Sequence, residues 1–234
     1  MRARVLVAVA APLLWSNWLL PRAGMGRRGR TVANTLAATG YTLVLGGRPN
    51  WVSGSGLRAG IGCAALVAAG YTVAAYLPPV RRVLGDSGDR AADVSTAEWV
   101  AVHIPLGTVY TEELIFRATL DPLLDTEFGS RVGTVAGAAA FGLWHIHPAR
   151  AAGDSVAVTV AFTGASGLLF GALARYSGSV TAPALLHWAV NAGGALLARK
   201  TLGRAGVGSS PRHRPGAPAV FAGRGRADGD TLRR

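Results

Sequence analysis

The sequence predicts an all-α membrane protein: a polytopic helix bundle of about seven transmembrane helices (range about six to eight), followed by a disordered basic tail. Three observations predict this class. Half of the 234 residues are apolar and only 15% are charged, whereas a soluble domain carries about 25% charged residues. The mean hydropathy is +0.31. The 32 glycines suit helices that approach one another closely in a bilayer.

The apolar residues form runs long enough to cross a bilayer, which takes about 17–25 residues in a helix. The candidate spans are 4–20, 31–47, 57–79, 97–120, 131–147, 155–175 and 178–198. The first run follows the basic sequence MRAR and also resembles a signal peptide. Because no small-residue cleavage site precedes a soluble domain, we favour a retained helix and keep the signal peptide as the alternative.

The distribution of charge along the chain disfavours nucleic acid as a partner. The 24 Lys and Arg residues outnumber the 12 Asp and Glu residues, which gives a net charge of +12. Such a basic chain would suit nucleic-acid binding. The arginines, however, lie between apolar runs and in the tail rather than along one amphipathic face. We therefore expect the lipid bilayer as a partner and no nucleic acid.

The positions of the basic residues predict the topology. They concentrate in segments 21–30, 80–96 and 199–234, and cytoplasmic segments carry an excess of Lys and Arg. This distribution predicts a multi-pass protein of the cell (plasma) membrane with a cytoplasmic C-terminal tail. The tail is rich in Gly, Pro, Ser and Arg, which is typical of disorder. Arg2 and Arg4 oppose the arrangement, so the number of spans and the side of the N-terminus stay open.

Two adjacent glutamates, Glu112 and Glu113, lie inside the apolar run 97–120. Charged groups at bilayer depth are costly and usually face the interior of a bundle. Glu113 and Arg117 are four residues apart, so they share a helix face and can form an ion pair. Glu112 is turned about 100° away from Glu113 on an α-helix and is left for another role.

Two later apolar runs carry histidines with partners four residues away. Phe141 precedes His145, and His187 precedes Asn191. The loop between the runs that carry Glu112 and His145 is centred near residue 128, about equally far from both. Two antiparallel helices would therefore place Glu112 and His145 at a similar depth.

These residue types point to hydrolysis by an activated water. A glutamate in a cavity of low dielectric constant can act as a general base, and His145 can share or orient the water. His187 and Asn191 can donate hydrogen bonds to an oxyanion. The single cysteine, Cys63, lies far from these motifs. No cofactor is favoured, but a zinc ion on Glu112, His145 and His187 is the alternative.

The motifs resemble those of a known family. Glu112-Glu113-Leu-Ile-Phe-Arg117, Phe141 to His145 and His187 to Asn191 occur in the order found in the CPBP intramembrane proteases, which include the type 2 CAAX prenyl endopeptidases and the Abi proteins.

The resemblance implies a role for each motif residue. Glu112 is similar to the catalytic glutamate, which activates water with His145, and His187 and Asn191 match the residues that hold the oxyanion. Glu113 and Arg117 match supporting residues, and Phe141 packs near the site. The resemblance covers about residues 97–198, which form the predicted catalytic helix core. The sequence predicts N-terminal transmembrane helices and loops (1–96) before this core and the tail (199–234) after it.

The sequence therefore predicts an intramembrane endopeptidase, of glutamate or metallo type, that hydrolyses a peptide bond of a membrane-associated or lipid-modified, CAAX-like substrate. Two alternatives remain. One is a non-catalytic immunity or scaffold protein that binds a peptide or a membrane partner. The other is a proton-coupled transporter in which Glu112 and the histidines form a relay.

Overall fold

The structure is a computed structural model that describes residues 2–78 and 94–208. Within these residues every regular element is a helix, as predicted. The first rod is continuous and consists of α1 (Arg2–Leu14), the π-helical segment η1 (Trp15–Leu19) and α2 (Leu20–Arg22). Two further helices follow: α3 (Arg27–Val44) and α4 (Gly54–Ala74).

The second part of the chain begins with one long helical rod that carries both glutamates. Its segments are α6 (Thr96–Glu98), the π-helical segments η2 (Trp99–Tyr110) and η3 (Glu113–Leu120), and α7 (Asp121–Phe128). The remaining helices are α8 (Ser130–Trp144), α9 (Ile146–Ala152), α10 (Val156–Ser177) and α11 (Thr181–Gly208).

Residues suited to helix ends set several of these boundaries. The hydroxyls of Ser53, Ser95 and Ser155 accept hydrogen bonds from the first turns of α4, α6 and α10, as good N-caps do. Gly153 and Gly178 follow α9 and α10 in the left-handed conformation, which glycine adopts at little cost.

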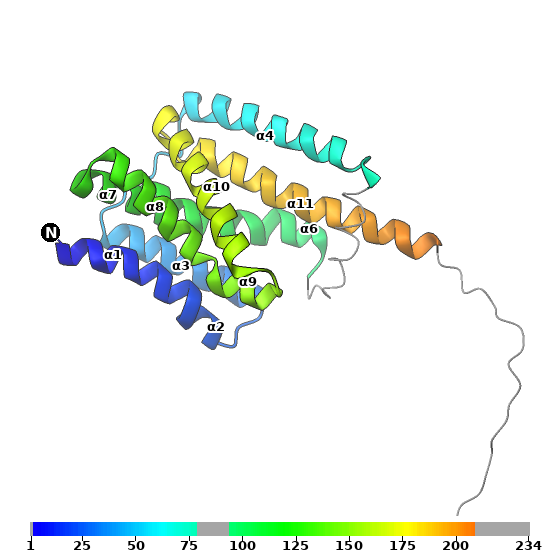
Figure 1. The fold of residues 1–234 in the computed structure, drawn as a ribbon, viewed down its shortest axis with the longest axis horizontal. Coiled ribbons are helices and arrows are strands. Elements are labelled where there is room, and N and C mark those ends of the chain that lie inside the picture. Colours follow the sequence, from blue (N-terminus) through cyan, green and yellow to red (C-terminus); the bar gives the residue numbers. More distant parts are fainter. Residues whose placement is uncertain (1, 79–93, 209–234) are drawn as a thin grey trace, which may run out of the picture.

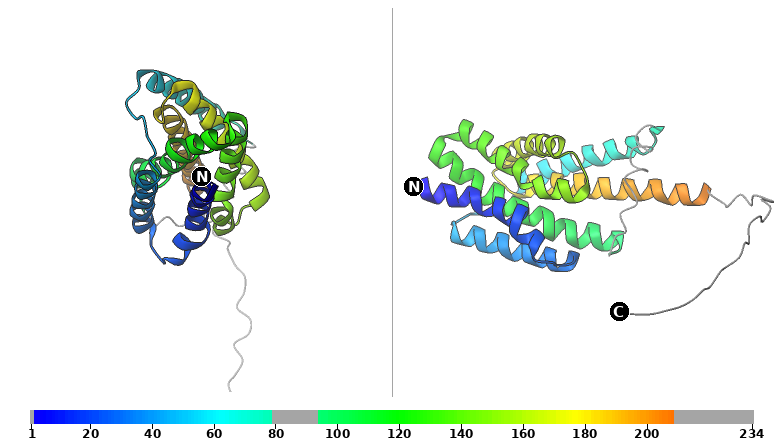
Figure 2. Two further views of the ribbon diagram at one scale, coloured as in Figure 1. Left: turned by 90° about the vertical axis from the view of Figure 1, so that its left-hand side faces the viewer. Right: turned by 60° about the horizontal axis from the view of Figure 1, so that its bottom comes forward.

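The helices pack as a bundle in which α4 lies along α11 and α8 lies against α10 (Figure 1). Seen from the end at which the chain begins, α1 lies between α3 and α8 (Figure 2). Hydrogen bonds support both neighbours of the first rod. The Tyr41 hydroxyl of α3 donates to the Ala8 carbonyl of α1, and the Ser16 hydroxyl of η1 donates to the Trp144 carbonyl of α8.

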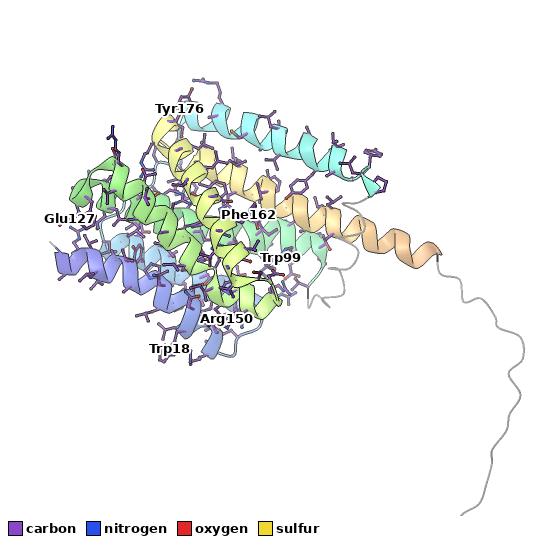
Figure 3. All side chains as sticks on the ribbon, viewed as in Figure 1. Trp18, Trp99, Glu127, Arg150, Phe162 and Tyr176 are labelled. Atoms are coloured by element: carbon purple, nitrogen blue, oxygen red, sulfur yellow. The ribbon has the colours of Figure 1, made fainter. Side chains whose placement is uncertain are left out.

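The bundle buries charge and exposes apolar side chains, as expected of a membrane protein. Glu113 and Arg117 are buried, whereas Val44, Leu66 and Phe162 are largely exposed. Phe162 and Tyr176 of α10 are labelled in Figure 3. Among the described helices, three are long and apolar enough to cross a membrane: Ala3–Arg22, Gly54–Ala74 and Val156–Ser177. The count of about seven spans stays a prediction.

The predicted start of the disordered tail at residue 199 is wrong. Helix α11 continues through Gly208, because no proline interrupts the chain before Pro211. The remaining tail residues, 209–234, and most of the basic segment 80–96 lie outside the described residues.

Candidate active site

Glu112 lies at the junction of η2 and η3, with 5% of its surface exposed. Its two carboxylate oxygens have different surroundings. Oε1 accepts a hydrogen bond of 3.2 Å from the indole Nε1 of Trp144. Oε2 has no hydrogen-bond partner in the described part of the chain. It faces Nε2 of His187 at 3.7 Å and Nε2 of His145 at 4.0 Å. A buried acid oxygen therefore faces two imidazole nitrogens.

His145 stands at the break between α8 and α9. Its backbone N–H bonds to the Gly142 carbonyl, which tightens the last turn of α8. Its ring Nδ1 lies 2.8 Å from the Phe141 carbonyl. Because a carbonyl oxygen only accepts hydrogen bonds, Nδ1 carries the hydrogen in this contact. The ring atom that faces Glu112 is then Nε2, which in the neutral ring is the basic nitrogen.

His187 of α11 links the two glutamates. Its Nδ1 lies 2.9 Å from Oε1 of Glu113, and its Nε2 faces Glu112. The ring stacks on Phe170, with 4.8 Å between centroids. A carboxylate on one ring nitrogen fixes which nitrogen carries the hydrogen and how the ring is turned. Glu113 thus orients His187 toward Glu112.

Behind Glu113, a row of buried ionisable side chains continues along η3 into α7. Arg117 Nε lies 3.6 Å from Glu113 Oε2, and Arg117 Nη1 donates to Asp121 Oδ2 at 3.1 Å. The ion pair expected between Glu113 and Arg117 is present, and Asp121 extends it by one turn. Beyond it, Arg117 and Asp121 line a cavity of about 220 Å³ together with Arg48, Asp125 and Arg175.

Phe141 is the aromatic centre of the site. Its ring packs edge-on against Phe116 and His145, each at 5.0 Å between centroids. The Arg117 guanidinium lies 4.8 Å from the same ring. Phe141 therefore contacts the catalytic candidates on one side and the ion-pair row on the other.

The structure brings together Glu112, His145 and His187 but gives Asn191 a different neighbour. Asn191 lies one turn beyond His187 on α11, and its side-chain Nδ2 donates to the His187 carbonyl at 3.1 Å. This bond uses one of the two hydrogens on the amide nitrogen.

Sequence reasoning missed Trp144 and Asp121. Asp121 had a usable signal, because it lies four residues after Arg117 on the same helix face. Trp144 had none, because its indole reaches Glu112 only through the packing of α8 against the rod that carries the glutamates.

The same three side chains form the alternative zinc site. Zinc takes nitrogen and oxygen ligands at about 2.0–2.2 Å. Among residues 2–78 and 94–208, no group of three or more His, Cys, Asp or Glu side chains has the spacing of a metal site. Zinc on Glu112, His145 and His187 stays the alternative to a site without metal.

Comparison with known proteins agrees with the motifs. Residues 94–193 match the family model described as Type II CAAX prenyl endopeptidase Rce1-like. No curated protein and no solved structure matches the chain. The matched segment contains Glu112, Glu113, Arg117, Phe141, Trp144, His145, His187 and Asn191. The match supports the resemblance of this helical core to the CPBP and CAAX protease family.

Proposed function

We propose that this membrane protein is an intramembrane endopeptidase in which Glu112 and His145 activate a water molecule. The match of residues 94–193 to the Rce1-like family model supports a hydrolase acting on peptide bonds. The observation that carries the assignment is the buried Oε2 of Glu112, which has no hydrogen-bond partner among residues 2–78 and 94–208 and faces two imidazole nitrogens. A buried acceptor without a partner is costly, and a water can donate to Oε2 while its oxygen attacks a substrate.

In the proposed reaction, Glu112 accepts a proton from water as the water oxygen bonds to the peptide carbonyl carbon. Nε2 of His145 orients this water by accepting a hydrogen bond from its other O–H. The negative charge that develops on the carbonyl oxygen is held by Nε2 of His187, which carries a hydrogen in the imidazolium form of the ring, and by the second N–H of Asn191, because preorganised donors stabilise such charge strongly. Glu112 then delivers the proton to the peptide nitrogen as the C–N bond breaks. The products are a carboxylic acid and an amine. The acid then loses its proton to the amine or to solvent and becomes a carboxylate.

An apolar cavity supports a membrane-associated or lipid-modified, CAAX-like substrate. It has a volume of about 460 Å³, and its lining includes Val109 and Tyr110 of η2 and Leu185 and Trp188 of α11. These two elements also lead to Glu112 and carry His187. A hydrocarbon chain bound here would place its attached peptide near the acid and the imidazoles.

Cleavage of membrane-tethered peptides tests the proposal. Full-length protein in detergent is given a quenched library of lipid-anchored peptides, next to Glu112→Gln and His145→Ala. Each variant is expected to lose about 10²–10⁴-fold in rate, as expected when a general base is removed. Glu127→Gln is the matched control, because Glu127 lies at the far end of α7 (Figure 3).

Other outcomes would contradict the protease. Unchanged cleavage in Glu112→Gln would remove the acid from the mechanism. Peptide binding without cleavage in every variant would support the scaffold alternative. Proton flux in liposomes that disappears in Glu112→Gln would support the transporter.

We also propose that hydrolysis needs no metal. Cleavage is expected to continue after exhaustive treatment with a strong chelator, and metal analysis of the active protein is expected to find less than one zinc per chain. Activity that is lost with chelator and restored by zinc would overturn this part of the proposal.

A further inference from the structure

The helix break that carries His145 needs hydrogen-bond partners from elsewhere in the molecule. The last carbonyls of a helix and the first N–H groups of the next have no partners within those helices. At the junction of α8 and α9 these groups include the carbonyls of Leu143 and Trp144 and the N–H of His147. Trp144 is buried, so its carbonyl requires a protein partner.

The first helical rod supplies all three partners from two consecutive residues. The Ser16 hydroxyl donates to the Trp144 carbonyl at 2.7 Å. The Asn17 side-chain Nδ2 donates to the Leu143 carbonyl at 3.0 Å, and its Oδ1 accepts from the His147 N–H at 2.8 Å. Asn17 therefore bridges the end of α8 and the start of α9, on both sides of His145.

Local geometry explains how neighbouring residues reach one junction. Ser16 and Asn17 lie in the π-helical segment η1. A π-helical turn contains more residues than an α-helical turn, so successive side chains diverge less. Figure 1 shows α9 beside the end of the first rod, near α2. Ser16 and Asn17 lie outside the segment that matches the family model.

We propose that Ser16 and Asn17 are positioning residues that hold the α8–α9 junction. Through this junction they position the two side chains that it brings to Glu112, the Trp144 indole and the His145 ring. Ser16 binds the carbonyl of the same tryptophan whose indole donates to Glu112. Asn17 fixes the turn from which the His145 ring projects. The catalytic consequence rests on the proposed function, whereas the orientation of His145 does not.

Kinetics of full-length variants test the catalytic consequence. Ser16→Ala and Asn17→Ala are expected to lower kcat by about 10- to 100-fold with KM unchanged, because small misplacements of catalytic groups cost rate. Ser16→Thr keeps the hydroxyl and is expected to restore kcat. Asn34→Ala is the matched control, since Asn34 also bridges helices through Trp15 and Gly107 but does not contact the junction.

Nitrogen NMR of ¹⁵N-histidine-labelled protein tests the orientation without any substrate. The His145 signals, assigned with His145→Ala, are expected to show hydrogen on Nδ1 in the parent protein. In Asn17→Ala a population with hydrogen on Nε2 is expected to appear, whereas Asn34→Ala keeps the parent spectrum. Asn17→Asp retains the acceptor for His147 but loses the donor to Leu143, and is expected to be intermediate.

The two measurements separate the two proposals. A changed His145 spectrum in Asn17→Ala, in a protein that cleaves no peptide, would support the positioning role and overturn the protease. Cleavage and spectra that respond equally in Asn17→Ala and Asn34→Ala would overturn the positioning role and leave the protease intact.

Discussion

At the scale of single residues, the role of Glu112 depends on which of its two carboxylate oxygens faces each neighbour. Oε1 of Glu112 accepts a hydrogen bond from the Trp144 indole, whereas Oε2 faces the imidazoles of His145 and His187. Because each carboxylate oxygen has two lone pairs, Oε2 keeps both of them for a water molecule. The indole therefore orients the carboxylate without blocking the oxygen proposed to act as the base.

Trp144→Phe tests the orienting role of the indole. The change keeps an aromatic ring and removes one hydrogen bond to a charged group, which contributes about 1.5–3 kcal/mol. We expect kcat/KM to fall by about 10- to 100-fold. Trp15→Phe, which loses a comparable bond to Asn34, is expected to leave kcat/KM near the parent value. Equal losses in both variants would contradict the orienting role.

Arg117→Met tests the buried ion-pair row. The change leaves Glu113 and Asp121 without their cation, and breaking a buried pair in this way costs about 3–5 kcal/mol. We expect a large fall in the unfolding temperature in detergent. Arg175→Met removes the partly exposed pair with Asp125, which contributes at most about 1 kcal/mol. Similar unfolding temperatures for the two variants would refute the prediction.

At the scale of whole helices, glycines set the distances that assemble the site. A Cβ at Gly142 of α8 would lie 2.7 Å from the Val160 carbonyl of α10. A Cβ at Gly167 of α10 would lie 3.2 Å from Phe141. Close approach through small residues is typical of helices packed in membranes. This close approach also places Phe170 of α10 against the rings of Phe141 and His187.

Gly142→Ala tests this close approach. The new methyl meets backbone rather than a movable side chain, so α8 and α10 must separate, at a cost of about 1–3 kcal/mol. The unfolding temperature and the cleavage rate are both expected to fall. Gly62→Ala on α4 meets nothing within 4 Å and gains up to about 1 kcal/mol of helix propensity. A neutral or stabilising Gly142→Ala would show that the two helices tolerate separation.

At the scale of the whole molecule, large apolar side chains are exposed on the described helices, while four ionisable side chains of the site are buried. Glu112, Glu113, Arg117 and Asp121 are all buried in the bundle. Bulky apolar side chains cover much of the outer surface of α4 and α10. A hydrophobic exterior of this kind is stable in lipid and aggregates in water. Assays of this chain therefore require detergent, nanodiscs or vesicles.

Reporter fusions test the expected orientation of the chain. The excess of basic residues predicts a cytoplasmic C-terminus. In bacteria, green fluorescent protein fused to residue 234 is expected to fluoresce. Alkaline phosphatase at the same position is expected to be inactive, because its disulfides need an oxidising compartment. The opposite pattern would reverse the topology and place the tail outside the cytoplasm.

The local patterns of the sequence predicted much of this arrangement, and contacts between distant segments supplied the rest. The spacing of four residues predicted the ion pair between Glu113 and Arg117. The position of the loop near residue 128 predicted that Glu112 and His145 would lie close together. The span predicted for residues 131–147 breaks at His145, two residues before its predicted end. Pro148 favours a break here, because it has no N–H to donate to the Trp144 carbonyl four residues earlier. Ser16 and Asn17 gave no signal, since their partners are about 130 residues away along the chain.

That separation has a consequence for biosynthesis. Ser16 and Trp144 are 128 positions apart, and ribosomes add about 5–20 residues per second. Roughly 6–25 s therefore pass between the synthesis of Ser16 and the synthesis of Trp144, its hydrogen-bond partner. During this interval Ser16 and Asn17 lack the partners in α8 and α9 that they contact in the folded chain. The contact between His187 and Glu113 forms later still, after α11 has been made.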